Sequence, residues 1–195
     1  NKIIPPHIVA GQNLAFFPMG PIFRRSGAFF MRRSFRGLKL YPTVFKQYIK
    51  TLINEGYPIE FFIEGTRTRT GKLSTPKMGI LSYLLDAVDE GYNSDMIFVP
   101  ITITYDRILE ESSYHMELKG KEKETETTSA FVKSRKLLKR KYGKVYLSFN
   151  KPFSYREYRD SLKEGEDIAD SLGHFITRRI NEIVMATPFS ITSAA

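Results

Sequence analysis

Apolar positions along the chain follow two alternating spacings, and these predict strands separated by helices. Short apolar runs bounded by turn residues predict strands at 8–10, 28–31, 59–63, 96–104 and 145–149. Apolar side chains spaced three and four residues apart predict helices from Tyr41 to a stop at Gly56, and at 77–90, about 130–142 and about 166–185.

This alternation predicts an α/β fold, with a mostly parallel sheet and helices on both faces. In such sheets ligands gather outside the carboxyl ends of the strands. The rule selects the segments after Met31, after Ile63 and after Thr104 as candidate sites.

Composition sets the class of protein. The 195 residues are 42% hydrophobic and 26% charged, which suits one globular domain. The chain has no cysteine, so disulfides, thiolate metal sites and a cysteine nucleophile are excluded. No run approaches the roughly 18 apolar residues of a spanning helix.

The net charge of +9 favours anionic partners, namely nucleic acid, anionic lipid or phosphorylated small molecules. The excess is concentrated in two segments, 24–39 and 133–144, which contain cations and no acids.

Arg32 and Arg33 follow the predicted strand at 28–31. A guanidinium group is a planar fork that can hold phosphate through two hydrogen bonds, so paired arginines at a strand end are candidate phosphate ligands. The alternative is an exposed basic turn.

The next candidate is the loop after Ile63, where an apolar strand leads into glycines, hydroxyls and cations. Gly65 lets backbone N–H groups approach an anion, and Thr66 adds a hydroxyl donor. Arg67 and Arg69 add positive charge. The alternative is a solvated loop held by a salt bridge.

Glu64 would repel phosphate, so its expected role is to orient an arginine or to accept a hydrogen bond from a substrate hydroxyl. A nucleotide-binding P-loop is rejected for this segment, because five residues separate Gly65 from Gly71 and Leu73 stands where Ser or Thr must bind magnesium.

The third segment, 97–106, is predicted to be mostly core strand. Pro100 lacks a backbone N–H, which indicates a bulge or an edge position near the site.

Three sequence blocks in this order resemble those of the glycerolipid acyltransferase superfamily: GAFFMRRSF, FFIEGTRTRTGKL and IFVPITITYD. The flanking stretches, AGQNLAFFPMGPIFRRSGAFFMRRSFRGLKLY and STPKMGILS, are similar to membrane-bound glycerol-3-phosphate and dihydroxyacetone-phosphate acyltransferases. The resemblance extends from about residue 6 to 149 and weakens beyond.

The resemblance implies transfer of a fatty acyl group from acyl-CoA or acyl carrier protein to the sn-1 hydroxyl of glycerol 3-phosphate, without a further cofactor or metal. It implies that Arg32 or Arg33 lies in the site and that Glu64, Gly65 and Arg67 surround the glycerol phosphate with Arg69 nearby, where Thr66 would add its hydroxyl. It also implies that Pro100 lies on the acyl-donor side. Dihydroxyacetone phosphate is an equal alternative as acceptor.

The family's first block is a His-x4-Asp box, whose histidine is the general base. No aspartate lies five positions after any of the three histidines, His7, His115 and His174. We therefore expect residues 1–195 to be a partial acyltransferase domain, truncated upstream of Asn1, with no catalytic residue of its own. His7 is expected to be a loop residue.

Two expectations concern partners other than the substrates. Apolar residues at 16–23 followed by Arg24 and Arg25 predict peripheral contact with the cytoplasmic face of a membrane, and the alternative is that this stretch packs against the upstream part.

A basic nucleic-acid-binding module is the runner-up function, because the cationic segment 133–144 could contact a phosphate backbone. The favoured interpretation has no nucleic-acid partner, since core packing explains most aromatic residues.

Overall fold

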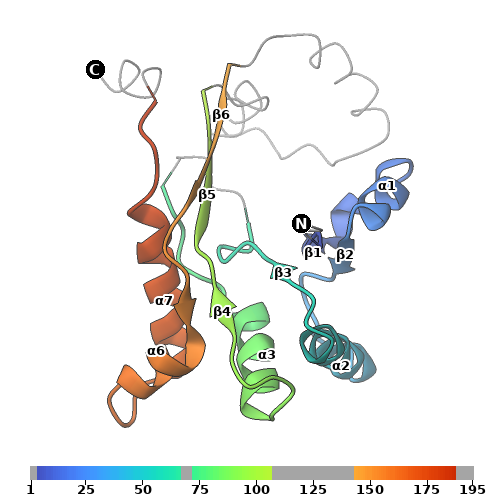
Figure 1. Ribbon diagram of the computed structural model, residues 1–195. Helices are drawn as coiled ribbons and strands as arrows, with labels where there is room; N and C mark the ends of the chain where they lie inside the picture. Colours follow the sequence, from blue (N-terminus) through green and yellow to red (C-terminus); the bar gives the residue numbers. More distant parts are fainter. Residues whose placement is uncertain (1–3, 67–71, 107–142, 188–195) are drawn as a thin grey trace.

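The structure is a computed structural model that describes residues 4–66, 72–106 and 143–187. Its first half comprises β1 (His7–Gly11), the 3-10 turn η1 (Gln12–Leu14), α1 (Met19–Arg25), β2 (Ala28–Met31), α2 (Leu40–Asn54), β3 (Ile59–Glu60) and α3 (Met78–Asp89). Its second half comprises β4 (Ile97–Phe98), β5 (Ile101–Tyr105), β6 (Val145–Phe149), β7 (Phe153–Ser154), α6 (Tyr155–Ser161) and α7 (Ile168–Asn181). Figure 1 shows their arrangement.

A three-stranded parallel sheet forms the N-terminal part, in the order β2-β1-β3. Gly11 of β1 pairs with Met31 of β2, and Ile8 pairs with Glu60 of β3. The predicted α/β class with a parallel sheet is confirmed. All three strands therefore end at one edge of the sheet.

The later strands form two antiparallel pairs, β4 with β7 and β5 with β6. The strand predicted at 96–104 is divided at Val99 and Pro100, where its pairing changes from β7 to β6. The alternation of strands and helices did not predict these antiparallel pairs, because strand direction depends on the path of the connecting chain.

Helix α2 packs against α3 and one face of the parallel sheet. Phe45, Ile49 and Ile53 of α2 and Leu84 of α3 are buried together, and Phe29 of β2 packs against them.

Two lysines of α2 also form ion pairs with α3 and the residue that follows it. Lys46 Nζ lies 2.7 Å from an Asp86 oxygen and 3.1 Å from a Glu90 oxygen, and Lys50 pairs with Glu90.

Helix α3 also contributes to a second buried cluster. Its Leu81 and Leu85 pack with Leu172 of α7 and Phe98 of β4. The hydroxyl of the fully buried Tyr155 donates to Asp89, 3.0 Å from its Oδ2, and burial together with this bond raises the pKa of Tyr155 to about 12. The Phe61 and Met96 side chains contact both clusters, so the two cores are continuous.

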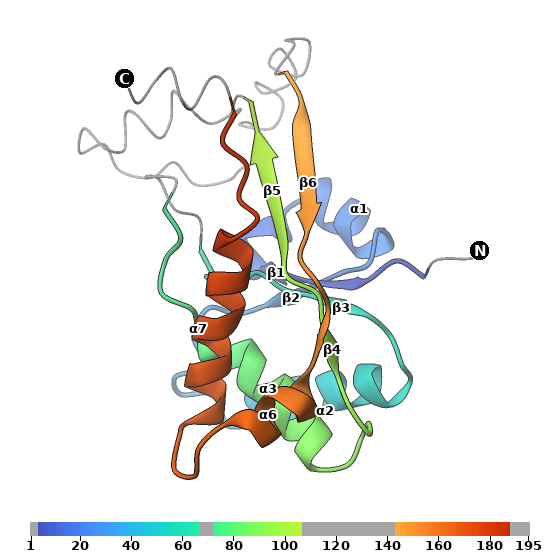
Figure 2. The same ribbon diagram turned by 60° about the vertical axis from the view of Figure 1, so that its left-hand side comes forward.

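The two faces of the sheet are covered unequally. Phe29 faces α2, whereas Phe30 points to the other face, where the Arg24 guanidinium of α1 lies 5.3 Å from its ring centroid. Figures 1 and 2 both show α1 and α2 on opposite sides of β1 and β2. Helices therefore flank this part of the sheet on both faces, as predicted.

Several elements differ from the sequence prediction. The short helices α1 and α6 were not predicted, because α1 includes Gly20 and Pro21 and α6 is mostly polar. His7 begins β1 instead of lying in a loop, since its N–H donates to the Pro58 carbonyl 2.8 Å away. The helix predicted at about 130–142 lies outside the described residues.

Candidate anion-binding site at the carboxyl edge of the sheet

Two of the three candidate segments leave the parallel sheet at the same edge. Arg32 and Arg33 follow the last residue of β2, and the loop that begins at Phe61 follows the last residue of β3. Strands β2 and β3 both flank β1, so they are about 10 Å apart. Arginine side chains from one segment can therefore reach a ligand that also contacts the other.

Arg32 is held at its backbone while its charge remains exposed. Its N–H donates to the Tyr41 hydroxyl 3.2 Å away, and its guanidinium carbon lies 5.5 Å from the Tyr41 ring centroid. Tyr41 lies in the first turn of α2. Arg33, next in sequence, is exposed. The sequence did not predict that Tyr41 would anchor this turn.

The loop after β3 begins with a tight turn. The Gly65 N–H donates to the Phe62 carbonyl 2.9 Å away, and Gly65 has a φ of +61°. This is the left-handed region that a glycine adopts without steric cost. Ile63 is buried inside the turn, so its side chain anchors the loop in the core while Thr66 is exposed.

Glu64 closes the loop on its far side. Its Oε2 accepts a hydrogen bond from the Ser74 N–H at 2.7 Å. The Lys77 N–H donates to the Ile63 carbonyl 2.7 Å away, so two hydrogen bonds join the beginning of the loop to its end. Through this hydrogen bond Glu64 fixes the two ends of the loop, which is a third role beside the two expected ones.

Lys77 is a further candidate site residue, which sequence reasoning missed. A Cβ built on Gly65 would lie 3.2 Å from the Lys77 Cγ, so the lysine stem passes directly over the glycine. Lys77 immediately precedes α3, and its side chain is exposed. No sequence spacing indicates this contact, since twelve positions separate the two residues and the turn brings them together.

The remaining predicted residues are placed as follows. Arg67 and Arg69 lie outside the described residues. Pro100 is buried between β4 and β5, and its carbonyl accepts a hydrogen bond from the Asn150 N–H at 2.9 Å. Pro100 was predicted at a bulge or an edge position within one strand, whereas the structure ends β4 before it and begins β5 after it. Its acyl-donor role stays a prediction.

A shallow cleft of about 240 Å³ lies elsewhere, between α2 and α3, and Lys46, Lys50 and Tyr83 are among the residues that line it. Its lysines already pair with Asp86 and Glu90, and the hydrogen bonds from Lys50 and Lys46 hold the pKa of Glu90 below its usual value. Because its cations are paired with carboxylates, this cleft is a weaker anion site than the sheet edge.

The described part of the chain has neither a metal-binding cluster nor a helix that could span a membrane. No group of three or more His, Asp or Glu side chains there is arranged to hold a metal ion. None of the helices there has the length and apolarity needed to cross a bilayer.

Comparison with protein families gives two matches along the chain. Residues 2–104 match the family model described as Acyltransferase. Residues 114–195 match the model described as Glycerol-3-phosphate acyltransferase C-terminal region. The first match contains every candidate site residue, and it covers more than half of the 195 residues.

The relatives that match the chain are named glycerol-3-phosphate acyltransferase. The chain is 38% identical over 208 residues to a glycerol-3-phosphate acyltransferase of Shewanella loihica, in a match that covers 98% of this chain and 26% of the relative. It is 46% identical over 156 residues to one of Haemophilus ducreyi, covering 80% and 19%. The chain thus spans about a quarter or less of the length of these relatives.

A solved structure also matches with a TM-score of 0.49 and 19% identity. It is a crystal structure of the 1-acyl-sn-glycerophosphate (LPA) acyltransferase from Thermotoga maritima, and the match covers 95% of this chain and 60% of that one.

Proposed function

The chain belongs to the acyltransferase family, and we propose that it binds the phosphate of glycerol 3-phosphate while a fatty acyl group is transferred to the sn-1 hydroxyl. The names of the relatives support glycerol 3-phosphate as the acceptor. The match to the glycerol-3-phosphate acyltransferase C-terminal region supports the same acceptor.

The observation on which this proposal depends is that the Arg32–Arg33 turn and the loop after β3 leave the parallel sheet at the same edge. Arg32 and Arg33 follow β2, and the Glu64–Thr66 turn follows β3 on the other side of β1. A phosphate between them could accept from guanidinium groups on one side and from the loop on the other. Lys77, packed over Gly65, adds a further cation to the loop.

The proposed reaction is acyl transfer from the thioester of acyl-CoA or acyl carrier protein. The sn-1 oxygen attacks the thioester carbonyl, a C–O ester bond forms, the C–S bond breaks, and the hydroxyl proton ends on the departing thiol. General-base help requires a group near that hydroxyl. The 195 residues contain no His-x4-Asp arrangement, so the residues named here act by holding the acceptor.

Glu64 serves this binding by fixing the loop ends through Ser74. Its bond to a backbone N–H needs an ionised or acceptor oxygen, which glutamine also offers but alanine does not. Pro100 is proposed to shape the acyl-donor side. Dihydroxyacetone phosphate has the same phosphate group, so it remains the alternative acceptor.

Calorimetric titration with glycerol 3-phosphate tests the proposal. We expect saturable binding that Arg33→Ala or Arg67→Ala weakens by roughly 10- to 150-fold, because a charge-assisted hydrogen bond contributes about 1.5–3 kcal/mol. Arg156→Ala is the matched control, since it removes the same charge from exposed α6, far from the sheet edge in Figure 1.

Equal weakening in all three variants would mean that only bulk charge is being measured, and would contradict a built site. A parallel titration with dihydroxyacetone phosphate separates the two acceptors, because a preference of tenfold or more identifies the one that is recognised beyond its phosphate.

We further propose that α1 and the residues before it contact the cytoplasmic face of a membrane peripherally. Phe17 is 76% exposed and Ile22 is 50% exposed, and Arg24 and Arg25 follow on the same short helix. Apolar side chains beside cations combine insertion with attraction to anionic headgroups.

Vesicle flotation tests the membrane proposal. The chain should float with anionic vesicles at low salt and partly at high salt, because inserted side chains are not screened by ions. Phe17→Ser should abolish the salt-resistant part, whereas Leu40→Ser, at the equally exposed start of α2, should leave it unchanged. Complete release of the unmodified chain by salt would show that it binds through charge alone.

A further inference from the structure

The ribbon formed by β5 and β6 has one covered and one uncovered face. Thr102 and Thr104 are half-buried, and α7 packs against β5. Ile101, Ile103 and Tyr105 are exposed. The same alternation of exposed and covered residues is found in β6 and in β4, which precedes β5. The exposed apolar side chains of this face are Ile97, Val99, Ile101, Ile103, Tyr105, Val145, Leu147 and Phe149. The prediction that 97–106 is mostly core is therefore wrong for its odd-numbered residues.

This distribution is the reverse of what an isolated sheet requires. A half-solvated antiparallel sheet turns its apolar side chains inward and its polar side chains outward. Here the threonines of β5 and Ser148 of β6 are on the partly covered face, whereas Leu147 is 54% exposed. The more apolar face of the ribbon thus lacks a covering layer within the described residues.

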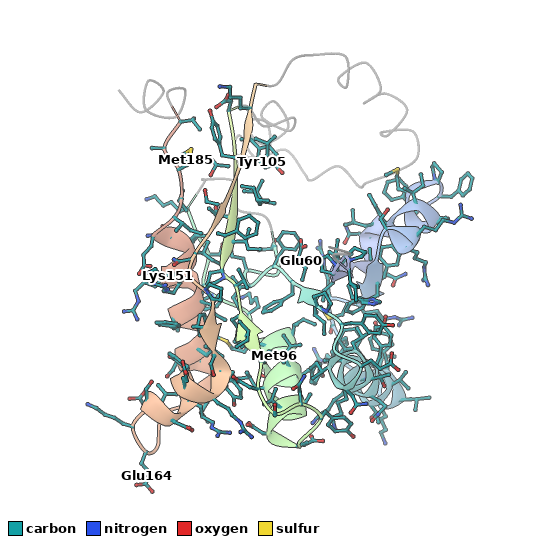
Figure 3. All side chains as sticks on the ribbon, in the orientation of Figure 1. Glu60, Met96, Tyr105, Lys151, Glu164 and Met185 are labelled. Atoms are coloured by element: carbon teal, nitrogen blue, oxygen red, sulfur yellow. The ribbon has the colours of Figure 1, made fainter. Side chains whose placement is uncertain are left out.

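We call the eight exposed apolar residues the ribbon face; six of them lie on β5 and β6, and Ile97 and Val99 precede β5 in the same alternation. Across the ribbon Ile101 pairs with Phe149, Ile103 with Leu147, and Tyr105 with Val145. None of these side chains is charged. In Figure 3, Tyr105 marks one end of the ribbon, and Lys151 lies just beyond the other.

The size of the ribbon face is that of a stable interface. Its eight side chains are between 38% and 61% exposed. At about half exposure, eight apolar side chains present on the order of 800 Å². That is about the area each partner contributes to a standard protein–protein interface, and more than monomers usually leave open.

We propose that the ribbon face is a dimerisation surface and that its occupant is a second copy of this chain. A two-fold axis would place the two ribbon faces together like the layers of a β-sandwich, about 10 Å apart. The net charge of +9 opposes association of two copies, but no charged side chain lies on the ribbon face itself. The rival surface at 14–23 exposes fewer large apolar side chains, namely Phe17 and Ile22.

Sedimentation equilibrium on the 195-residue chain tests this proposal, which does not depend on the proposed enzymatic function. We expect a mass of twice 22.5 kDa at tens of micromolar. Leu147→Glu should weaken the dimer at least about tenfold, because it would bury an unpaired carboxylate. Val44→Glu is the matched control, since Val44 is 57% exposed on α2 and should leave the dimer intact.

Cross-linking supplies a second measurement if Leu147→Glu disturbs folding. The chain has no cysteine, so Leu147→Cys and Val44→Cys each introduce a single thiol. A short bis-maleimide should join two copies of the Leu147→Cys chain and not of the Val44→Cys chain. A monomer at every concentration, or a dimer that both glutamate variants weaken equally, would overturn the proposal.

Discussion

Mixed with an acyl-CoA and glycerol 3-phosphate, the 195-residue chain should release CoA no faster than a protein-free mixture. General-base help is worth roughly 10²- to 10⁴-fold in enzymes. None of its histidines, His7, His115 and His174, has an aspartate five positions later. His7 begins β1, at the edge of the parallel sheet opposite the candidate site. A thiol-reactive dye measures the release.

The comparison enzyme for this assay is the full-length glycerol-3-phosphate acyltransferase of Shewanella loihica. Mixtures without glycerol 3-phosphate correct for thioester hydrolysis. Rapid CoA release by the 195-residue chain that depends on glycerol 3-phosphate would mean that its own residues supply the base, and the assignment of Glu64 to loop closure would then need revision.

Leu81→Ala should lower the free energy of unfolding by about 2–5 kcal/mol, which is the range for truncating a buried leucine. Leu81 is fully buried, and its side chain belongs to the cluster that joins α3 to Leu172 of α7. Alanine preserves the helix, so the loss comes from packing and the cavity. Urea unfolding followed by circular dichroism measures it.

Leu40→Ala makes the same chemical change where the side chain is 74% exposed, at the start of α2. Its effect should stay within about 0.5 kcal/mol. Equal losses in the two variants would contradict the central position of α3 between the two buried clusters.

Local patterns predicted most elements of this chain. The apolar runs at 28–31 and 145–149 coincide with β2 and β6, and the helical spacing from Tyr41 coincides with α2 to within two residues. These elements follow from side-chain periodicity, which is a property of neighbouring residues. Strand β3 is shorter than the predicted 59–63, because the turn that Gly65 closes on Phe62 ends it early.

The same reasoning predicted where the candidate site lies but not the contacts that hold it together. The rule that ligands gather at strand ends selected Arg32, Arg33 and the Glu64–Thr66 loop, and the parallel register places both segments at one edge. The supporting contacts were not predictable. The Glu64–Ser74 hydrogen bond and the passage of Lys77 over Gly65 depend on how the loop returns to α3.

The amino-acid order was therefore sufficient for the element types, the excess of positive charge, the strand-end arginines and the absence of a His-x4-Asp box, because each depends on residues close in sequence or on composition. The partners of the later strands and the side of β5 that is covered required the folded chain. Alternating Ile and Thr in β5 predicts which residues share a face, but the position of α7 determines which face is covered. Because α7 covers the threonine face, the isoleucines of β5 point outward. Periodicity depends on neighbouring residues, whereas contacts between distant segments depend on the packing of the whole domain.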